Sequence, residues 1–267
     1  MYSVAFLDSG VGGLPYLQAA KEIIPGMSVQ YLADNAGFPY GTKTASSLKE
    51  ILADRVRRLR SRFLPDALVI ACNTASQIGL TSLRKAHPDF PIIGTVPAIK
   101  PAAQETKTGR IGVMATESTV KDIYLQNLIA EHASDVEVIK LPAQALVSFI
   151  EKKYLFSTPQ ERESEIKPYI DFLLEKKVDR IVLACTHFLH VEKDIEQYLA
   201  KAAANSVKVV ESQWGVARRL AQILASCEAP AERAEQENRF LLTSDPPFDP
   251  MYALWAERFG LSAPDKL

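Results

Sequence analysis

Two stretches decide the fold: DALVIACNT at residues 66–74 and its echo DRIVLACTH at residues 179–187. Each runs from an aspartate through an apolar segment typical of a buried parallel strand, and each then reaches a cysteine followed by polar residues. A second pair, SVAFLDS at 3–9 and RIGVMAT at 110–116, occurs in the same order. Buried strands often share such apolar patterns, so the matched cysteines carry the argument. The echoes predict two related lobes.

Short apolar runs alternate with longer segments of helical periodicity up to about residue 226. The predicted strands lie at 3–8, 28–33, 67–72, 91–96, 110–115, 136–141, 179–185 and 207–211. The predicted helices lie at 13–24, 46–63, 75–86, 117–132, 144–153, 158–176, 191–203 and 213–226. Such alternation predicts an α/β fold with a mostly parallel sheet and helices on both faces in each lobe.

The tail breaks this alternation. Residues 228–238 form a polar stretch, 244–250 a turn, and 251–259 a short helix that we expect to pack on the N-terminal lobe. The predicted N-terminal lobe comprises residues 1–97 plus 208–267, and the predicted C-terminal lobe residues 98–207.

Composition excludes several classes of protein. A chain of 267 residues with 47% hydrophobic residues can bury a large core. Its net charge is −1 and its basic residues form no stripe, so nucleic acid is not an expected partner. No apolar run approaches the length of a membrane span, and the N-terminus has no basic leader. These features predict a cytoplasmic protein that does not bind membranes.

The cysteine set is sparse and odd in number: Cys72, Cys185 and Cys227. This argues against a disulfide scaffold and predicts free thiols. A small buried residue is the commonest role of such a cysteine, and it suits Cys227, which ends an amphipathic helix. Ligands of open α/β sheets bind beyond the carboxyl ends of the strands. We therefore expect Cys72 and Cys185 to face an active site in a cleft between the lobes.

The residues beside the two thiols can assist proton transfer or hold an anion. Asn73, Thr74 and Thr186 either cap their helices or hydrogen-bond an anionic ligand, and the sequence leaves both roles open. Asp8, at the end of the first strand, is either an N-cap or a proton partner on the Cys72 side. His187 is a candidate proton partner for Cys185, since an imidazole titrates near neutrality.

The glycine-rich loop at residues 7–13 does not predict a dinucleotide site. A full G-x-G-x-x-G motif would need glycine at position 15, where Pro15 stands, so no nicotinamide or flavin cofactor is expected. Cys185 and His187 alone do not make a zinc site. In the loop at 34–43, Gly41 and Thr42 are candidates for binding a small polar acid.

Four motifs together resemble the glutamate racemases of the aspartate/glutamate racemase family. They are LDSGVGG at 7–13, PYGTK at 39–43, ACNTA at 71–75 and ACTH at 184–187, and the resemblance extends through 115–119 and the tail. It implies cofactor-independent inversion of the α-carbon of glutamate by two cysteines, which supplies D-glutamate for peptidoglycan. A homodimer is compatible with the sequence.

The resemblance also assigns roles to individual residues. It makes Cys72 and Cys185 the acid/base thiols, supported by Asp8 and His187 respectively, and it places Glu151 near the second thiol. The positions that match substrate contacts are Ser9, Tyr40, Gly41, Asn73, Thr74, Thr116, Thr119 and Thr186. The chain departs from the family pattern at Leu141, Phe188-Leu189 and Glu211, none of which is a predicted catalytic residue.

Three alternatives stay open on the sequence alone. An aspartate racemase could use the same pair of thiols, with the reach of the pocket deciding between the substrates. A ligand-binding protein would bind without interconverting enantiomers. A thiol redox pair is disfavoured because Cys72 and Cys185 lack C-x-x-C spacing.

Overall fold

The computed structural model describes residues 1–227 and 237–267, which divide into two compact units. The first unit comprises Met1–Thr95 and Gln213–Leu267, and the second comprises Val96–Ser212. Each unit is built on its own parallel sheet, so the predicted α/β class with two lobes is confirmed.

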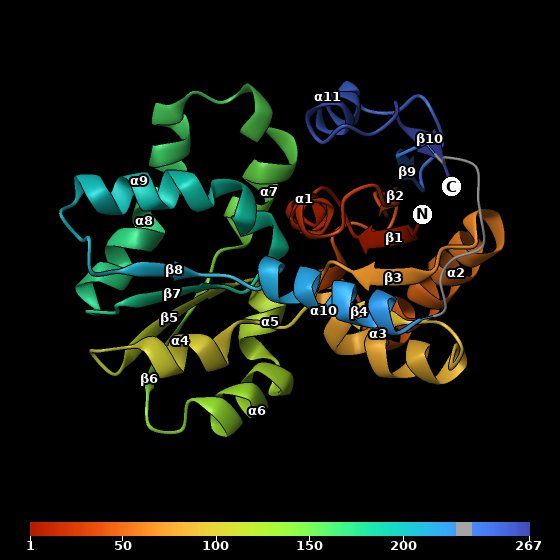
Figure 1. Ribbon diagram of the computed structural model, residues 1–267. Coiled ribbons are helices and arrows are strands. Elements are labelled where there is room, and N and C mark those ends of the chain that lie inside the picture. Colours follow the sequence, from red (N-terminus) through yellow and green to blue (C-terminus); the bar gives the residue numbers. More distant parts are fainter. Residues whose placement is uncertain (228–236) are drawn as a thin grey trace. The chain divides into compact units, whose positions relative to one another are not determined.

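The first unit contains a six-stranded sheet of order β10-β9-β2-β1-β3-β4, whose neighbouring strands all run parallel. Figure 1 shows β2, β1 and β3 side by side in this unit. The strands are β1 (Ser3–Asp8), β2 (Ser28–Ala33), β3 (Ala67–Ile70), β4 (Ile92–Gly94), β9 (Arg239–Leu242) and β10 (Asp265–Lys266). Every residue of β1, β2 and β3 is buried, because helices cover both faces of the central strands.

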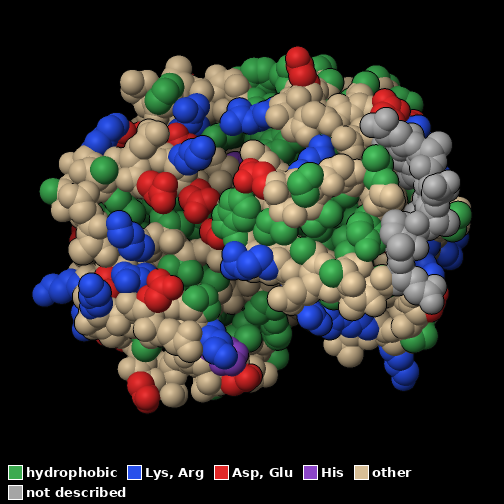
Figure 2. All heavy atoms as spheres, viewed as in Figure 1, with side chains coloured by type: hydrophobic (Ala, Val, Ile, Leu, Met, Phe, Trp, Pro, Cys, Tyr) green, Lys and Arg blue, Asp and Glu red, His purple; other side chains and the backbone are tan. Residues whose placement is uncertain are grey.

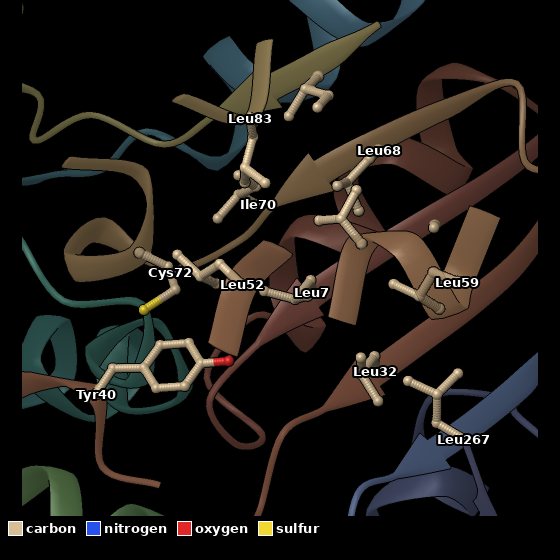
Figure 3. Close-up of a cluster of buried hydrophobic side chains, with 14 of the residues drawn as sticks. Leu7, Leu32, Tyr40, Leu52, Leu59, Leu68, Ile70, Cys72, Leu83 and Leu267 are labelled. Atoms are coloured by element: carbon tan, nitrogen blue, oxygen red, sulfur yellow. The ribbon is translucent and has the colours of Figure 1, made fainter. Parts of the chain in front are cut away.

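The helices of the first unit form two groups. They are α1 (Leu14–Ile23), α2 (Ala45–Phe63), α3 (Asn73–Ala86), α10 (Gln213–Ser226) and α11 (Pro250–Arg258), with a 3-10 turn, η1, at Tyr40–Thr42. Helices α2 and α3 pack together, and their apolar residues join Ala5 and Leu7 of β1 in one core cluster (Figure 3). Helix α1 packs against α10.

The second unit repeats this plan with the strand order β6-β5-β7-β8, all parallel. Its strands are β5 (Arg110–Ala115), β6 (Glu137–Pro142), β7 (Arg180–Leu183) and β8 (Lys208–Val210). Its helices are α4 (Ile99–Glu105), α5 (Glu117–Lys121), α6 (Ile123–His132), α7 (Gln144–Lys152), α8 (Pro159–Glu175) and α9 (Glu192–Lys201), with 3-10 turns η2 (Tyr154–Phe156) and η3 (Thr186–Val191).

The two sheets share one topology, since β2-β1-β3-β4 corresponds to β6-β5-β7-β8. In the first sheet the chain places β2 on one side of β1 and then crosses to the other side of β1 to form β3 and β4. In the second sheet it places β6, β7 and β8 around β5 in the same way. The strand order therefore reverses between β1 and β3, and likewise between β5 and β7. In doubly wound sheets this switch point opens a crevice at the carboxyl ends of the two strands.

The structure corrects several predicted elements. The expected helix at 117–132 is two helices, because Asp122 stops α5 and its side chain caps α6 by accepting from the Tyr124 amide at 2.7 Å. The expected helix at 191–203 begins at Glu192, after the turn η3. Helix α4 and strands β9 and β10 were not predicted. Residues 228–236 of the predicted polar stretch lie outside the described residues.

The tail returns to the first unit through β9, which pairs with β2, and through α11, whose Trp255 is fully buried. The contacts divide the units at 95/96 and 212/213, whereas the sequence places the boundaries at 97/98 and 207/208. Strand β8 pairs with β7, so residues 208–210 belong to the second sheet.

Candidate functional site

Cys72 lies at the switch point of the first sheet. It follows β3 and occupies the N-cap position of α3, with a side chain that makes no capping hydrogen bond. Its neighbour Ala71 donates its amide to Leu7 at 2.8 Å, which holds the end of β3 beside the end of β1. The thiol is not part of a disulfide among the described residues and is 7% exposed.

Asp8 ends β1 next to this turn and is fully buried. It is not the N-cap of α1, which is Gly13. Its Oδ1 accepts hydrogen bonds from the Gly10 amide at 2.9 Å and the Ser9 hydroxyl at 3.2 Å. A Cβ on Gly13 would lie 2.7 Å from the Cβ of Ala71 and 3.1 Å from that of Asp8. Only glycine lets the chain pass this closely between the two strand ends.

Asn73 is the first residue of α3 and does not cap that helix. The residue is 6% exposed, and neither the amide nitrogen nor the amide oxygen of its side chain has a hydrogen-bond partner among the described residues. Leaving such groups unpaired costs on the order of 1–3 kcal/mol. The N-cap position is taken by Cys72, so the capping alternative is wrong for Asn73. Thr74 follows it, also buried, in the first turn of α3.

Tyr40 lies beside Cys72 at one end of the core cluster, as Figure 3 shows. Burial raises the pKa of its phenol well above the ordinary value, and the charge of Asp34, its hydrogen bond, and the charges of Cys72 and Asp8 add to this effect. The phenol therefore keeps its proton, which it donates to Asp34 at 2.8 Å. Gly41 follows in η1 and is only partly buried.

The second sheet carries its thiol at the equivalent point. Cys185 follows β7, is free, and is 7% exposed. Its Sγ lies 3.9 Å from Nδ1 of His187, and Nε2 of the same ring lies 2.7 Å from Oε2 of Glu151. Glu151 reaches the ring because α7 packs against η3. The three residues form a thiol–imidazole–carboxylate relay, all of it buried.

The relay favours a charged imidazole. Burial by itself lowers the pKa of His187, but the hydrogen bonds to Cys185 and Glu151, together with their charges, raise it well above its ordinary value. As an imidazolium, the ring donates from both nitrogens, to the sulfur on one side and to the carboxylate on the other. A cation beside a thiol favours its thiolate form.

The remaining predicted residues of the second unit are buried near the same strand ends. Thr116 follows β5 and caps α5, its hydroxyl accepting from the Thr119 amide at 3.3 Å and lying 2.9 Å from the Thr119 hydroxyl. Thr186 opens η3 and is 2% exposed. The predicted residues thus gather into two sets, one in each unit.

Asp34 is the first residue of the loop at 34–43, and the sequence assigns it no role. It follows β2, and its amide donates to the Asp8 carbonyl at 2.8 Å. Three carboxyl-end residues, Asp8, Asp34 and Cys72, therefore sit on adjacent strands. An aspartate directly after a buried strand was the signal that could have identified it.

Glu192, directly after η3, provides a pH-dependent test of this region. Burial, together with the charges of Glu211 and Glu196, raises its pKa to about 7. Because the folded state binds this proton more tightly than the unfolded state, protonation of Glu192 favours folding. This contribution to the free energy of unfolding is fully present below the unfolded pKa of 4.5 and is lost as the pH rises through about 7. We expect Glu192→Gln to be nearly neutral at pH 5 and to increase the free energy of unfolding at pH 8 by about 1–2 kcal/mol after solvent screening.

Urea unfolding of this variant at the two pH values measures the difference. Glu175→Gln, on the exposed surface of helix α8, is the control, because Glu175 is not among the charges that act on Glu192, and its effect should change little with pH. An effect of Glu192→Gln that is equal at pH 5 and pH 8 would contradict the assignment.

Three features concern the described residues as a whole. No group of three or more His, Cys, Asp or Glu side chains among them is arranged to hold a metal ion. None of the helices in residues 1–227 and 237–267 combines the length and apolarity that a membrane crossing needs. On the face seen in Figure 2, basic and acidic side chains are interspersed and neither forms a stripe.

Comparison with known proteins gives one consistent result. The family model described as Asp/Glu/Hydantoin racemase matches residues 16–220. The glutamate racemase of Pectobacterium carotovorum is 32% identical, covering 99% of this chain and 91% of that protein. The glutamate racemase of Pseudomonas syringae pv. tomato is 38% identical, covering 83% and 78%.

Among solved structures, Escherichia coli glutamate racemase in complex with L-glutamate and the activator UDP-MurNAc-ala superposes with a TM-score of 0.88. It is 32% identical and covers 100% of this chain and 98% of that one. The Bacillus anthracis isoform RacE1 superposes with a TM-score of 0.77 at 26% identity, covering 100% and 97%. On its motifs, its fold and these relatives, the chain belongs to the Asp/Glu/hydantoin racemase family.

Proposed function

We propose that this protein acts as a glutamate racemase, interconverting L- and D-glutamate without a cofactor, with Cys72 and Cys185 as its acid/base groups. The observation that carries the proposal is the equivalent position of the two thiols, each two residues after the end of the strand that borders the switch point of its sheet. Relatives named glutamate racemase match along almost the whole chain, and the E. coli relative binds L-glutamate.

Racemisation without a cofactor needs a base on one face of the α-carbon and an acid on the other. In the proposed reaction one thiolate removes the α-proton while the other thiol delivers a proton to the opposite face. Their roles exchange in the reverse direction. Both cysteines must therefore reach the same α-carbon, from opposite sides.

Each thiol has its own partner for this exchange. His187, held by Glu151, stabilises the Cys185 thiolate when the ring is charged. Asp8 is the corresponding carboxylate at the strand beside Cys72. Because one partner is an imidazole and the other a carboxylate, the proposed site treats its two thiols differently.

The carbanion-like transition state also needs stabilisation, because an α-proton is only weakly acidic. The unpaired side-chain amide of Asn73 and the backbone amides of the first turn of α3, which have no partner within the helix, are preorganised donors beside Cys72. We propose that they bind a carboxylate of glutamate, which would satisfy the buried amide. Thr74, Thr186, Thr116, Thr119, Ser9, Tyr40 and Gly41 are the further proposed contacts.

Incubating the pure protein with L-glutamate in deuterated water, without added cofactor, tests the proposal. We expect D-glutamate to form and its α-carbon to carry deuterium, because the thiol that delivers the proton exchanges with solvent. Chiral chromatography with mass spectrometry measures both. A protein that binds glutamate but forms no D-enantiomer would be a binding protein, and the proposal would fail.

Glutamate should be preferred over aspartate by about a hundredfold in kcat/KM. A side chain one methylene shorter leaves buried donors of the pocket unpaired, at a cost of about 1–3 kcal/mol for each. Parallel assays with L-glutamate and L-aspartate measure the ratio. Equal kcat/KM values for the two substrates would indicate an amino-acid racemase with a broader substrate range.

We place this reaction in the cytoplasm as part of D-glutamate supply for peptidoglycan. The two free thiols support that location, because the chemistry requires them to stay reduced.

A further inference from the structure

The carboxylate of Asp34 is the centre of a buried hydrogen-bond network in the first unit. Asp34 is 0% exposed. Its Oδ2 accepts from the Tyr40 hydroxyl at 2.8 Å, and its Oδ1 accepts from Nε of Arg55 at 3.0 Å and from the Thr243 hydroxyl at 2.5 Å. Three distant parts of the chain, the loop after β2, helix α2 and the tail after β9, therefore meet on one carboxylate.

The same loop is clamped to the tail by a second set of bonds. Oδ1 of Asn35 accepts from the amides of Thr243 and Ser244 at 3.0 and 2.9 Å, and its Nδ2 donates to the Ser244 hydroxyl at 2.8 Å. The Thr243 hydroxyl also accepts from the Ala36 amide at 3.1 Å. The tail thus holds the start of the loop on both its backbone and its side chains.

The loop has little freedom to adjust. A Cβ on Gly37 would lie 2.3 Å from Oδ2 of Asp34 and 3.0 Å from the ring of Tyr40. The charge at the centre is also fixed. Burial lowers the pKa of Arg55, but the charges of Asp34 and Asp54 and the hydrogen bonds to them raise it overall, so the guanidinium stays charged opposite the carboxylate.

We propose that Asp34 and Thr243 are positioning residues for the racemase site, through which the C-terminal tail sets the place of the substrate-binding turn η1. Thr243 holds Asp34, and Asp34 holds the Tyr40 hydroxyl. Tyr40 begins η1, which contains Gly41 and packs against α3, the helix that follows Cys72. The role of Gly41 rests on the proposed function. The clamp itself rests only on the contacts above.

The network explains why an aspartate is buried here. A charge needed only for stability would be served as well by apolar packing, since buried ion pairs are weak contributors to folding. A carboxylate that accepts three bonds from three segments instead fixes their relative positions. Rigid support of this kind keeps a binding group in its productive geometry.

Thr243→Val tests the clamp, because it removes the hydroxyl and keeps the shape of the side chain. We expect KM for glutamate to rise about fivefold with kcat changed less than about twofold, because the loop loses the hydrogen bonds that the Thr243 hydroxyl makes with Asp34 and Ala36. Thr243→Ser should restore the wild-type KM. In the free protein, amide hydrogen exchange of residues 35–42 should accelerate in Thr243→Val only.

Thr106→Val is the matched control. Its hydroxyl also donates to a buried aspartate, Asp179, at 2.5 Å, but that aspartate precedes β7 and lies at the amino end of its strand. Thr106→Val should lower the free energy of unfolding without changing KM for glutamate or the amide hydrogen exchange of residues 35–42.

A double variant separates positioning from general damage. Tyr40→Phe removes the other end of the same relay, so combining it with Thr243→Val should raise KM no further than the larger single effect. Multiplicative effects would overturn the relay. Faster exchange of residues 35–42 with an unchanged KM would overturn the positioning role. Absence of racemisation in the wild-type chain would instead overturn the proposed function, and exchange would still report on the clamp.

Discussion

Replacing Cys72 or Cys185 by serine is expected to reduce racemisation in both directions by at least about a thousandfold. Each substitution leaves the fold in place but exchanges an ionisable thiol for a hydroxyl that scarcely ionises at neutral pH. Because every turnover needs both a base and an acid, neither cysteine can compensate for the other. Alanine variants should be equally inactive.

Cys227→Ser is the control for this prediction. Cys227 is the third free cysteine, it lies after the last turn of α10, and no predicted function falls on it. This variant should keep wild-type kcat, and circular dichroism should confirm that all three variants are folded. Near wild-type turnover in either Cys72→Ser or Cys185→Ser would refute the two-thiol mechanism.

Asp8→Asn and His187→Asn are expected to lower kcat by about a hundredfold or more, with KM changed only a few-fold, because a positioned proton partner contributes about 10²–10⁴ to rate. His187→Asn removes the charge that favours the Cys185 thiolate, and Asp8→Asn removes the carboxylate beside Cys72. Steady-state assays of both enantiomers measure kcat and KM. Glu151→Gln should reduce the contribution of His187 to kcat, because it weakens the 2.7 Å hydrogen bond between Glu151 and the His187 ring.

The assignment of each partner to its own thiol needs an isotope measurement. Two enantiomers have equal free energies, so kcat/KM must stay equal in the two directions whatever the substitution. The asymmetry appears instead in the primary isotope effects with α-deuterated L- and D-glutamate. Each variant should enlarge the effect for the enantiomer deprotonated by its own cysteine and reduce it for the other. Identical isotope effects for both enantiomers would indicate a shared structural role.

The parts of the candidate site that depend on residues close together in the sequence were predictable. Cys72 and Cys185 end buried strands, and the apolar runs before them place them at the carboxyl edge of a parallel sheet whatever the details of packing. Asp8 and Thr116 follow the first strand of each sheet in the same way. His187 lies two residues from its thiol, so its proximity also follows from the sequence.

The contacts between distant residues were not predictable in this way. Glu151 reaches His187 only because α7 packs on η3, and the sequence suggested the pair solely through family resemblance. The short strand β9 follows the polar stretch of the tail, and its role as a strand becomes evident only because it pairs with β2, more than 200 residues away in the chain. The periodicity of residues 117–132 likewise predicts one helix and does not reveal that Asp122 ends α5 and caps α6.

The sequence by itself determined the α/β class, the repeat of the lobes and the two thiols, because alternating apolar periodicity and strand-end chemistry are local properties of the chain. Only the tertiary structure decided that Asp34 joins Tyr40, Arg55 and Thr243, and that Asn73 keeps an unpaired buried amide. Hydrogen bonding and burial depend on which segments meet in space, and periodicity records only that a face is buried, without identifying what covers it.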